Sequence, residues 1–526
     1  MRFDRNILSL TFLIAALAWT LWFVFAGFGN HQDPLYWLYK YEQLEGGWMA
    51  AGTLLAGGAI VRLFGAQLLP LRLAGWLCTV AAISLPYVCL LDKEQRRNNL
   101  HWLALTFLLM GYGAFQEFSP GTLTVLLLSA ICVCVTQSSI NRTSSIVQSS
   151  ILTAVLAGLA VAVRFPNILV LLILIPLWRK RALWLVPIAA AAAGLVYLLG
   201  FWLITPAPLD AAMSSHEMMS MLTKLWEKSG LMLGYMLMAV GVLAFREKKY
   251  AGWFIGAAVA LFILYTIKPT QWYNFDLTYL ISAFVLVIVL AQSSIVNRQS
   301  SINRTLSIVQ SSIMIVATLG TDTAWLKLFP AVLCLLPVAL TQYKKLTERR
   351  FLFEVLVVLC AVVVVRFTTN SVGKTNLLEA RTVSTVSPYR HIAITPAEEH
   401  QLLQYKADFD SLSTLHQTSH ITHQTSNILS IGQENHLMRA VTGCEAARYN
   451  EFWSNIFDSV YTAKYQPIIE AEHPIVFCSF SPQFKTKPIY KDHESRLERM
   501  LLNAGYTAID RSAYKYMIYV YDPKVQ

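Results

Sequence analysis

The chain opens with an apolar run that passes directly into a polar, aromatic stretch, ILSLTFLIAALAWTLWFVFAGFGNHQDPLYWLY, at residues 7–39. The apolar part, residues 7–29, is long enough to cross about 30 Å of hydrocarbon as one helix. No small-residue cleavage site lies near it, so we expect a retained first helix and not a removed signal peptide. Asp33 follows among aromatic residues, which predicts a carboxylate at a membrane surface.

The composition of the whole chain predicts an α-helical polytopic membrane protein. Of the 526 residues, 55% are hydrophobic and only 14% are charged, whereas soluble proteins carry about 25% charged residues. The apolar residues gather in repeated runs of about 15 to 25 residues, the length of a membrane span. Basic residues cluster in short loops between these runs, which is the positive-inside pattern. The net charge of +11 therefore indicates membrane topology, and nucleic acid is not expected as a partner.

The basic loops predict the topology. They lie at residues 92–97, 179–181, 246–249 and 343–350, and we expect all four to be cytoplasmic. Even numbers of apolar runs separate these loops, but three runs precede the first of them. One run is therefore expected not to cross, and the Gly-rich run 48–65, which contains Arg62, is the best candidate for a surface helix. The alternative is that the charge rule fails at 92–97, where two acids stand among the bases.

This topology gives about 13 transmembrane helices, with the N-terminus in the cytoplasm and the last run ending outside. We predict a transmembrane domain at residues 1–368, in which residues 30–67 form the first outer loop and the surface helix. The composition turns polar after about residue 369, so residues 369–526 are predicted to form an extracytoplasmic domain.

The polar C-terminal region has the pattern of an α/β domain. Strands are predicted at 392–394, 427–431, 474–480 and 516–521, and an amphipathic helix at 491–504. Another helix should begin at the capping box Thr395-Pro-Ala-Glu398, which has Pro at its first helical position. Cys444 and Cys478 either form a disulfide in an oxidising compartment or remain buried free thiols.

A near-identical repeat interrupts the apolar pattern. Residues 137–151 recur at 299–313 with one change, Ser144 to Leu306. Loops tolerate insertions because the entropy of loop closure grows slowly with length. We therefore expect both copies to be inserted cytoplasmic loops, and we assign them no function.

Ionisable residues at the predicted outer ends of apolar spans are the candidates for function. The carboxylates are Asp33 and Glu117, and a carboxylate there can act as a general base. The cations are Arg164 and Lys268, which can hold a phosphate. Candidate substrate-binding residues are His31, Tyr36, Trp272, Tyr273 and Asp322. The competing interpretation is that the aromatic residues anchor the protein at the interface and that Lys268 snorkels to the membrane surface.

Four segments carry a resemblance to a known family. They are Gln32-Asp33-Pro-Leu-Tyr36, Val61-Arg-Leu-Phe-Gly65, Leu69-Pro-Leu-Arg-Leu-Ala-Gly75 and Leu156-Ala-Gly-Leu-Ala-Val-Ala-Val-Arg-Phe-Pro-Asn167. Together they resemble the GT-C class of membrane glycosyltransferases, which includes the protein O-mannosyltransferases and the lipid A aminoarabinose transferase. The resemblance implies a polyprenyl-phosphate sugar donor, an acceptor on the outer face of the bacterial inner membrane, and a surface helix after the first outer loop.

The resemblance also implies roles for the site residues. Asp33 would be the general base of an inverting hexosyl or pentosyl transfer, and Glu117 would orient the acceptor or support Asp33. Arg164, together with Lys268, would bind the donor phosphate. We expect no nucleotide-sugar site, because the sequence contains no Gly-rich phosphate loop, and we predict no metal, because no metal-ligand motif is visible. No cofactor is expected. The alternative functions are a transporter or flippase of a lipid-linked glycan and a non-catalytic membrane-anchored scaffold.

Overall fold

The computed structural model of this chain describes most of its helices and strands. The described residues are 5–27, 32–110, 117–140, 145–206, 226, 229–230, 232–241, 273–296, 301–318, 328–342, 346–369, 378–418, 428–432, 435–446, 465–479, 497–514 and 516–522. The candidate residues His31, Lys268, Trp272 and Asp322 lie outside this set, as does the basic loop 246–249.

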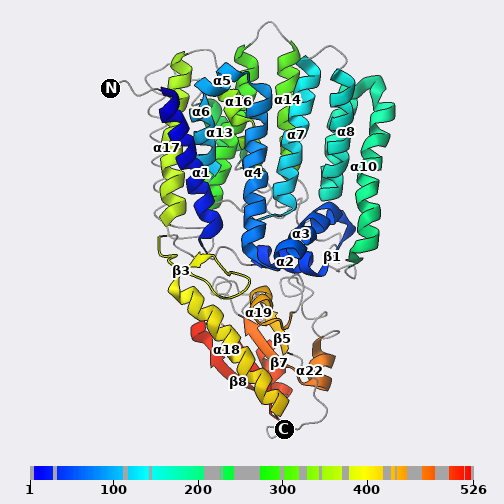
Figure 1. Ribbon diagram of the computed structural model, residues 1–526, viewed down its shortest axis with the longest axis vertical. Coiled ribbons are helices and arrows are strands. Elements are labelled where there is room, and N and C mark those ends of the chain that lie inside the picture. The colour runs from blue at the N-terminus through cyan, green and yellow to red at the C-terminus, as the bar shows by residue number, and fades with distance from the viewer. Residues whose placement is uncertain are drawn as a thin grey trace.

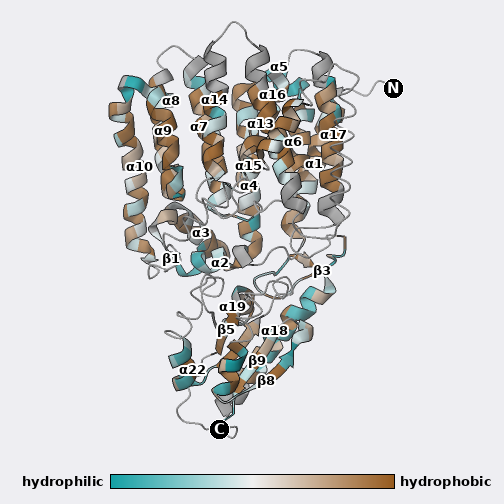
Figure 2. Ribbon diagram, turned by 180° about the vertical axis from the view of Figure 1, so that it is seen from behind, coloured by the Kyte–Doolittle hydropathy of each residue, from teal (hydrophilic) through white to brown (hydrophobic). Residues whose placement is uncertain are grey.

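A bundle of apolar helices forms the N-terminal part (Figures 1 and 2). Within the described residues, four helices are long and apolar enough to cross a membrane, and they are α1 (Arg5–Phe25), α4 (Leu68–Leu90), α7 (Pro120–Ile140) and α10 (Ala182–Leu203). The other helices of the bundle are α6 (Leu100–Met110), α8 (Ser145–Val163), α9 (Leu169–Trp178), α13 (Tyr273–Val296), α14 (Ser301–Ile315), α15 (Leu328–Leu333), α16 (Leu336–Gln342) and α17 (Leu346–Thr369). The helical membrane class is therefore confirmed, whereas about 13 spans stays a prediction.

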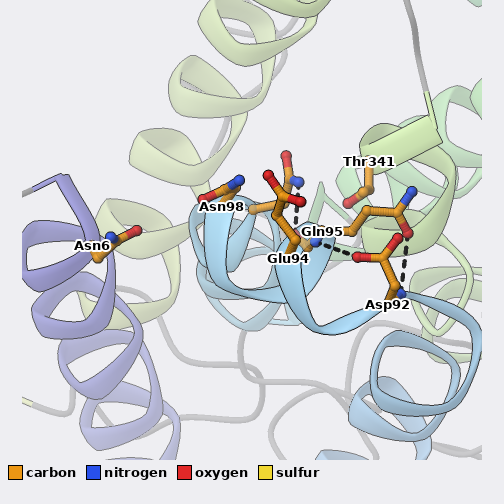
Figure 3. A pocket seen from close by; sticks show the side chains of 7 residues that line it. Asn6, Asp92, Glu94, Gln95, Asn98 and Thr341 are labelled. Carbon is orange, nitrogen blue, oxygen red and sulfur yellow. Dashed lines mark hydrogen bonds between the residues drawn. The ribbon is translucent and has the colours of Figure 1, made fainter.

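The two ends of the bundle differ in what they contain. At one end, Asn6 of α1, residues of the segment 92–99, including α5 (Lys93–Asn98), and Thr341 of α16 line a polar pocket of about 620 Å³ (Figure 3). The other end faces the C-terminal part and carries α2 (Gln32–Gln43) and α3 (Ala51–Phe64) (Figure 1). The start of α1 and the basic loop 92–97 thus share one end, as the topology requires. Which end is cytoplasmic stays a prediction.

Helix α3 occupies the segment predicted as a surface helix. Its 14 residues span about 21 Å, which is shorter than a hydrocarbon core of about 30 Å. Its glycines allow α2 to approach closely: a Cβ on Gly57 would lie 2.4 Å from the Tyr41 ring, and one on Gly58 would lie 2.3 Å from the Leu44 side chain. The Gly-rich composition therefore serves helix packing. The location of α3 at a membrane surface stays a prediction.

The repeated segments are helical where they are described, so the expected loop conformation was wrong for these residues, whereas their insertion and their cytoplasmic location stay predictions. Helix α7 continues to Ile140, α8 begins at Ser145, and α14 covers Ser301–Ile315. Polar side chains link these helices: Ser138 Oγ lies 2.7 Å from Ser149 Oγ, and Gln310 Nε2 donates to Thr136 Oγ1, just before the first repeat, at 2.7 Å. The Thr136 hydroxyl also donates to the carbonyl four residues earlier, so its hydrogen is bonded within the helix.

The C-terminal part contains a five-stranded sheet in the order β6-β5-β7-β9-β8. The strands are β5 (Ile428–Gly432), β6 (Glu445–Ala446), β7 (Ile475–Ser479), β8 (Tyr506–Arg511) and β9 (Tyr516–Tyr521). Strand β5 is parallel to β6 and β7, whereas β9 is antiparallel to β7 and β8. The helices of this part are α18 (Pro396–Thr418), α19 (Asn435–Thr442), α22 (Gln466–Glu472) and a helix at 497–503.

The strands predicted near 392–394, 427–431, 474–480 and 516–521 are present as β4 (Ala393–Ile394), β5, β7 and β9. The capping box is also present: Glu398 N donates to Thr395 Oγ1 at 3.3 Å, and Thr395 N donates to Glu398 Oε2 at 2.9 Å. Cys444 and Cys478 are buried and do not form the disulfide that the sequence left open. The boundary at residue 369 and the outer location stay predictions.

The C-terminal part docks on the end of the bundle that carries α2 and α3. Gly27 N donates to Ala393 O at 2.7 Å, and Leu68 N donates to Pro388 O at 3.0 Å. One buried apolar cluster runs through both parts and includes Leu38 of α2 and Leu437 of α19. On the far side of α2, β1 (Glu45–Gly46) pairs in parallel with β2 (Thr205–Pro206), which follows α10. Both ends of α2 are therefore anchored.

Candidate functional site

Helix α2 forms part of the segment predicted as the first outer loop, and Asp33 lies in its first turn. An acid followed by proline is suited to this place, because the helix dipole favours negative charge at the N-terminus and proline needs no amide partner there. The side chain of Asp33 lies outside the described part of the structure, so its role as general base stays a prediction.

Glu117 faces a buried arginine that the sequence had not marked as functional. Arg72 Nε lies 3.9 Å from Glu117 Oε1, and the two side chains are only 2% and 14% exposed. The same guanidinium donates from NH1 to Gly27 O at 2.9 Å. Backbone pairing fixes this arrangement, since Phe118 N donates to Leu71 O at 2.9 Å. Arg72 thus joins the end of α1, the start of α4 and the segment that precedes α7.

The far end of α2 reaches the same segment. Tyr41 is fully buried, and its hydroxyl donates to Phe118 O at 3.0 Å. Hydrogen bonds therefore hold the chain on both sides of Asp33. Arg72 donates to Gly27, which precedes α2, and Tyr41 of α2 donates to Phe118, the residue that follows Glu117. The structure therefore brings the helix of Asp33 and the Glu117 segment together, as the predicted site requires.

Arg164 lies where α8 ends and the 3-10 helix η2 (Phe165–Ile168) begins. Its side chain is buried, and NH1 donates to Ala317 O at 3.0 Å. The neighbouring Asn167 is fully buried and donates from Nδ2 to Thr124 Oγ1 and Ala160 O. Thr53 of α3 donates to Val163 O, which links the end of α8 to α3. A rigidly held guanidinium of this kind is suited to binding an anion.

Tyr36, a predicted substrate-binding residue, belongs to α2 and lies where this helix contacts the C-terminal part. Its half-buried ring meets His436 edge to face at 5.5 Å, and Lys40 Nζ lies 5.2 Å from its centroid. Tyr273 begins α13, and its side chain lies outside the described part of the chain. The sequence reading missed Lys40, His436 and Arg439, because nothing in the sequence indicated that α2 and α19 would meet.

Arg72 could have been found from the sequence. It stands in the second turn of an otherwise apolar run, where a charge is costly and therefore calls for a partner. Among the residues that the structure describes, no group of three or more His, Cys, Asp or Glu side chains could hold a metal ion. The polar pocket of Figure 3 lies at the opposite end of the bundle, and none of the predicted site residues lines it.

Comparison with known proteins rests on structure alone. No protein-family model and no curated protein sequence matches the chain. The structure of ArnT from Cupriavidus metallidurans bound to undecaprenyl phosphate matches with a TM-score of 0.53 at 11% identity, covering 99% of both chains. The same protein in the apo state gives a TM-score of 0.50 at 11% identity over 98% of both chains.

The oligosaccharyltransferase from Archaeoglobus fulgidus, in complex with zinc and sulfate, matches with a TM-score of 0.45 at 12% identity. That match covers 97% of this chain and 73% of the other. The chain is thus similar to ArnT, a lipid A aminoarabinose transferase, over almost its whole length, and it has the GT-C fold that its sequence motifs predicted.

Proposed function

We propose that this protein is a glycosyltransferase that moves a sugar from a polyprenyl-phosphate carrier to an acceptor on the outer face of a bacterial inner membrane. The observation that carries the proposal is the full-length match to ArnT, which was solved with undecaprenyl phosphate bound. The Arg72–Glu117 pair and the buried Arg164 support it, since they place charged groups at the end of the bundle that carries α2 and α3.

In the proposed reaction, Asp33 accepts the proton of an acceptor hydroxyl as a general base. The acceptor oxygen then attacks the anomeric carbon, and the bond from that carbon to the phosphate oxygen breaks. The electron pair of the broken bond leaves with the polyprenyl phosphate, and the anomeric configuration inverts. Glu117 would orient the acceptor or support Asp33, and its contact with Arg72 holds it beside the first outer stretch.

Arg164, together with Lys268, would bind the donor phosphate and stabilise the charge that develops on it as it leaves. A guanidinium offers five N–H donors in a fixed plane, so its bond to Ala317 O would set the orientation of that plane. His31, Tyr36, Trp272, Tyr273 and Asp322 are proposed to contact the substrates. The sugar is proposed to be a hexose or pentose.

The test compares Asp33→Asn and Arg164→Ala with matched controls in membranes that are supplied with a polyprenyl-phosphate sugar. The controls are Glu42→Gln, an exposed acid on the same helix, and Arg62→Ala, an exposed arginine on α3. Loss of a general base should reduce transfer by about 100-fold or more, and loss of the phosphate ligand should also reduce it. Wild-type rates of sugar transfer by both Asp33→Asn and Arg164→Ala would contradict the proposal.

A further inference from the structure

Helix α19 of the C-terminal part packs directly on α2, the helix whose first turn contains Asp33 (Figure 1). The Arg439 guanidinium lies over the Tyr39 ring, 3.7 Å from its centroid. Tyr39 is held in turn by a 2.8 Å hydrogen bond from its hydroxyl to Glu45 Oε2. Because Glu45 belongs to the short strand β1, which pairs with the strand β2 that follows α10, this contact joins α19 to the bundle through α2.

A second contact lies one turn earlier on both helices. The His436 ring meets the Tyr36 ring edge to face, with centroids 5.5 Å apart. Burial, together with the charges of Arg439 and Lys40, lowers the pKa of His436 to about 3. The imidazole is therefore neutral near pH 7, and it adds no positive charge between the two cations. The contact between α2 and α19 therefore includes the edge-to-face pair of Tyr36 and His436 and the Arg439 guanidinium over the Tyr39 ring.

Apolar packing between α2 and α19 extends the contact beyond these polar groups. Leu38 and Tyr41 of α2 share a buried cluster with Leu437 and Met438 of α19, and all four are at most 3% exposed. The same cluster includes Tyr389, which precedes the strand β4 that receives Gly27. The C-terminal part therefore contacts the first outer stretch at its beginning and along its helix.

We propose that Arg439 is a positioning residue of the transferase: through the stacked Tyr39 ring it fixes α2, and thereby the place from which Asp33 acts. This inference rests on the proposed function, in which Asp33 is the general base. A helix moves as one unit, and a displacement of about 1 Å at a reacting group can reduce a rate by about 100-fold. The C-terminal part is accordingly a component of the active site scaffold.

The kinetic test uses the full-length protein and a polyprenyl-phosphate sugar. Arg439→Gln should lower kcat by about three- to thirty-fold, the range expected from one cation–π contact. The KM for the donor should stay unchanged, because Arg439 is not proposed to touch the donor. Arg439→Lys, which keeps a cation, should recover part of the loss. Arg390→Gln, an exposed arginine of the same part, should behave as wild type. Equal kcat for Arg439→Gln and Arg390→Gln would overturn the inference.

A double-mutant cycle checks that Arg439 acts through Tyr39. Tyr39→Leu removes the ring face, so the double variant Tyr39→Leu with Arg439→Gln should lose little more than the worse single variant. Multiplied losses in the double variant would contradict the proposed route.

Hydrogen exchange of the amides at 35–43 in lipid nanodiscs gives a readout that does not depend on catalysis. Arg439→Gln should speed this exchange, and Arg390→Gln should leave it unchanged. If the wild type transfers sugar but neither kcat nor exchange responds to Arg439→Gln, the inference fails and the proposed function stands. If the wild type transfers no sugar from any polyprenyl-phosphate donor, the proposed function fails, and the exchange result alone decides whether α19 holds α2.

Discussion

Arg72 is a buried side chain that joins three segments of the candidate site, although the sequence pointed to other residues as candidates for function. Glu117 and Arg164 could be predicted from the sequence, because each ends an apolar run where charge is costly. The pairing of Arg72 with Glu117 and Gly27 could not be predicted, since it depends on how α1, α4 and α7 pack. The same holds for Arg439, whose partner Tyr39 lies in a different part of the chain.

Replacing Arg72 by glutamine should impair both stability and transfer. The side chain is 2% exposed, so its loss leaves Gly27 O and the Glu117 carboxylate buried without this donor. The expected cost in the free energy of unfolding is about 1–3 kcal/mol. Thermal unfolding in detergent measures this cost, and Arg62→Gln, an exposed arginine on α3, is the matched control. Identical melting temperatures for the two variants would show that the Arg72 contacts contribute nothing.

At the scale of elements, local signals predicted most of the C-terminal part. The capping box marked the start of α18, and continuous apolar runs marked β5, β7 and β9. Strand β8 was missed because its sequence, Tyr506-Thr-Ala-Ile-Asp-Arg511, has no clear alternation of apolar and polar residues. The repeats were interpreted as loops because their sequence is polar, and the hydrogen bonds that link α7, α8 and α14 leave no local sequence pattern.

Asp408 ties α18 to the sheet and should make the stability of the C-terminal part depend on pH. Its carboxylate accepts from Arg511 Nε at 2.8 Å and NH2 at 3.1 Å, and from the Tyr516 hydroxyl. Burial alone would raise the pKa of Asp408, but the hydrogen bonds from Arg511, Tyr516 and Gln404 outweigh it and lower the pKa.

Because the pKa of Asp408 is lower in the folded protein, its contribution is present above the unfolded pKa of about 3.9 and is lost as the pH falls through the folded value. Asp408→Asn should therefore destabilise the protein at pH 7 and weaken the dependence of unfolding on pH below about 4. Unfolding followed by tryptophan fluorescence from pH 3 to pH 7 checks both effects. Exposed Asp410→Asn serves as the control, and an acid response equal to that of wild type in Asp408→Asn would refute the assignment.

At the scale of the whole molecule, the sequence motifs predicted the GT-C fold, and the match to ArnT over 99% of both chains confirms it. The motifs could indicate the fold because they contain the charged residues and glycines that interrupt the apolar runs. The docking of the C-terminal part could not be predicted, since it depends on backbone bonds of Gly27 and Leu68, a shared apolar cluster and side-chain contacts between α2 and α19, none of which has a sequence signature.

The most direct test of the central claim is an experimental structure of the full-length protein with bound polyprenyl phosphate. The account predicts that the phosphate lies within about 3 Å of the Arg164 guanidinium, at the end of the bundle that carries α2. The Asp33 carboxylate and Glu117 should line the same cavity. A phosphate bound elsewhere, or an Asp33 carboxylate turned away from the cavity that holds Arg164, would contradict the proposed site.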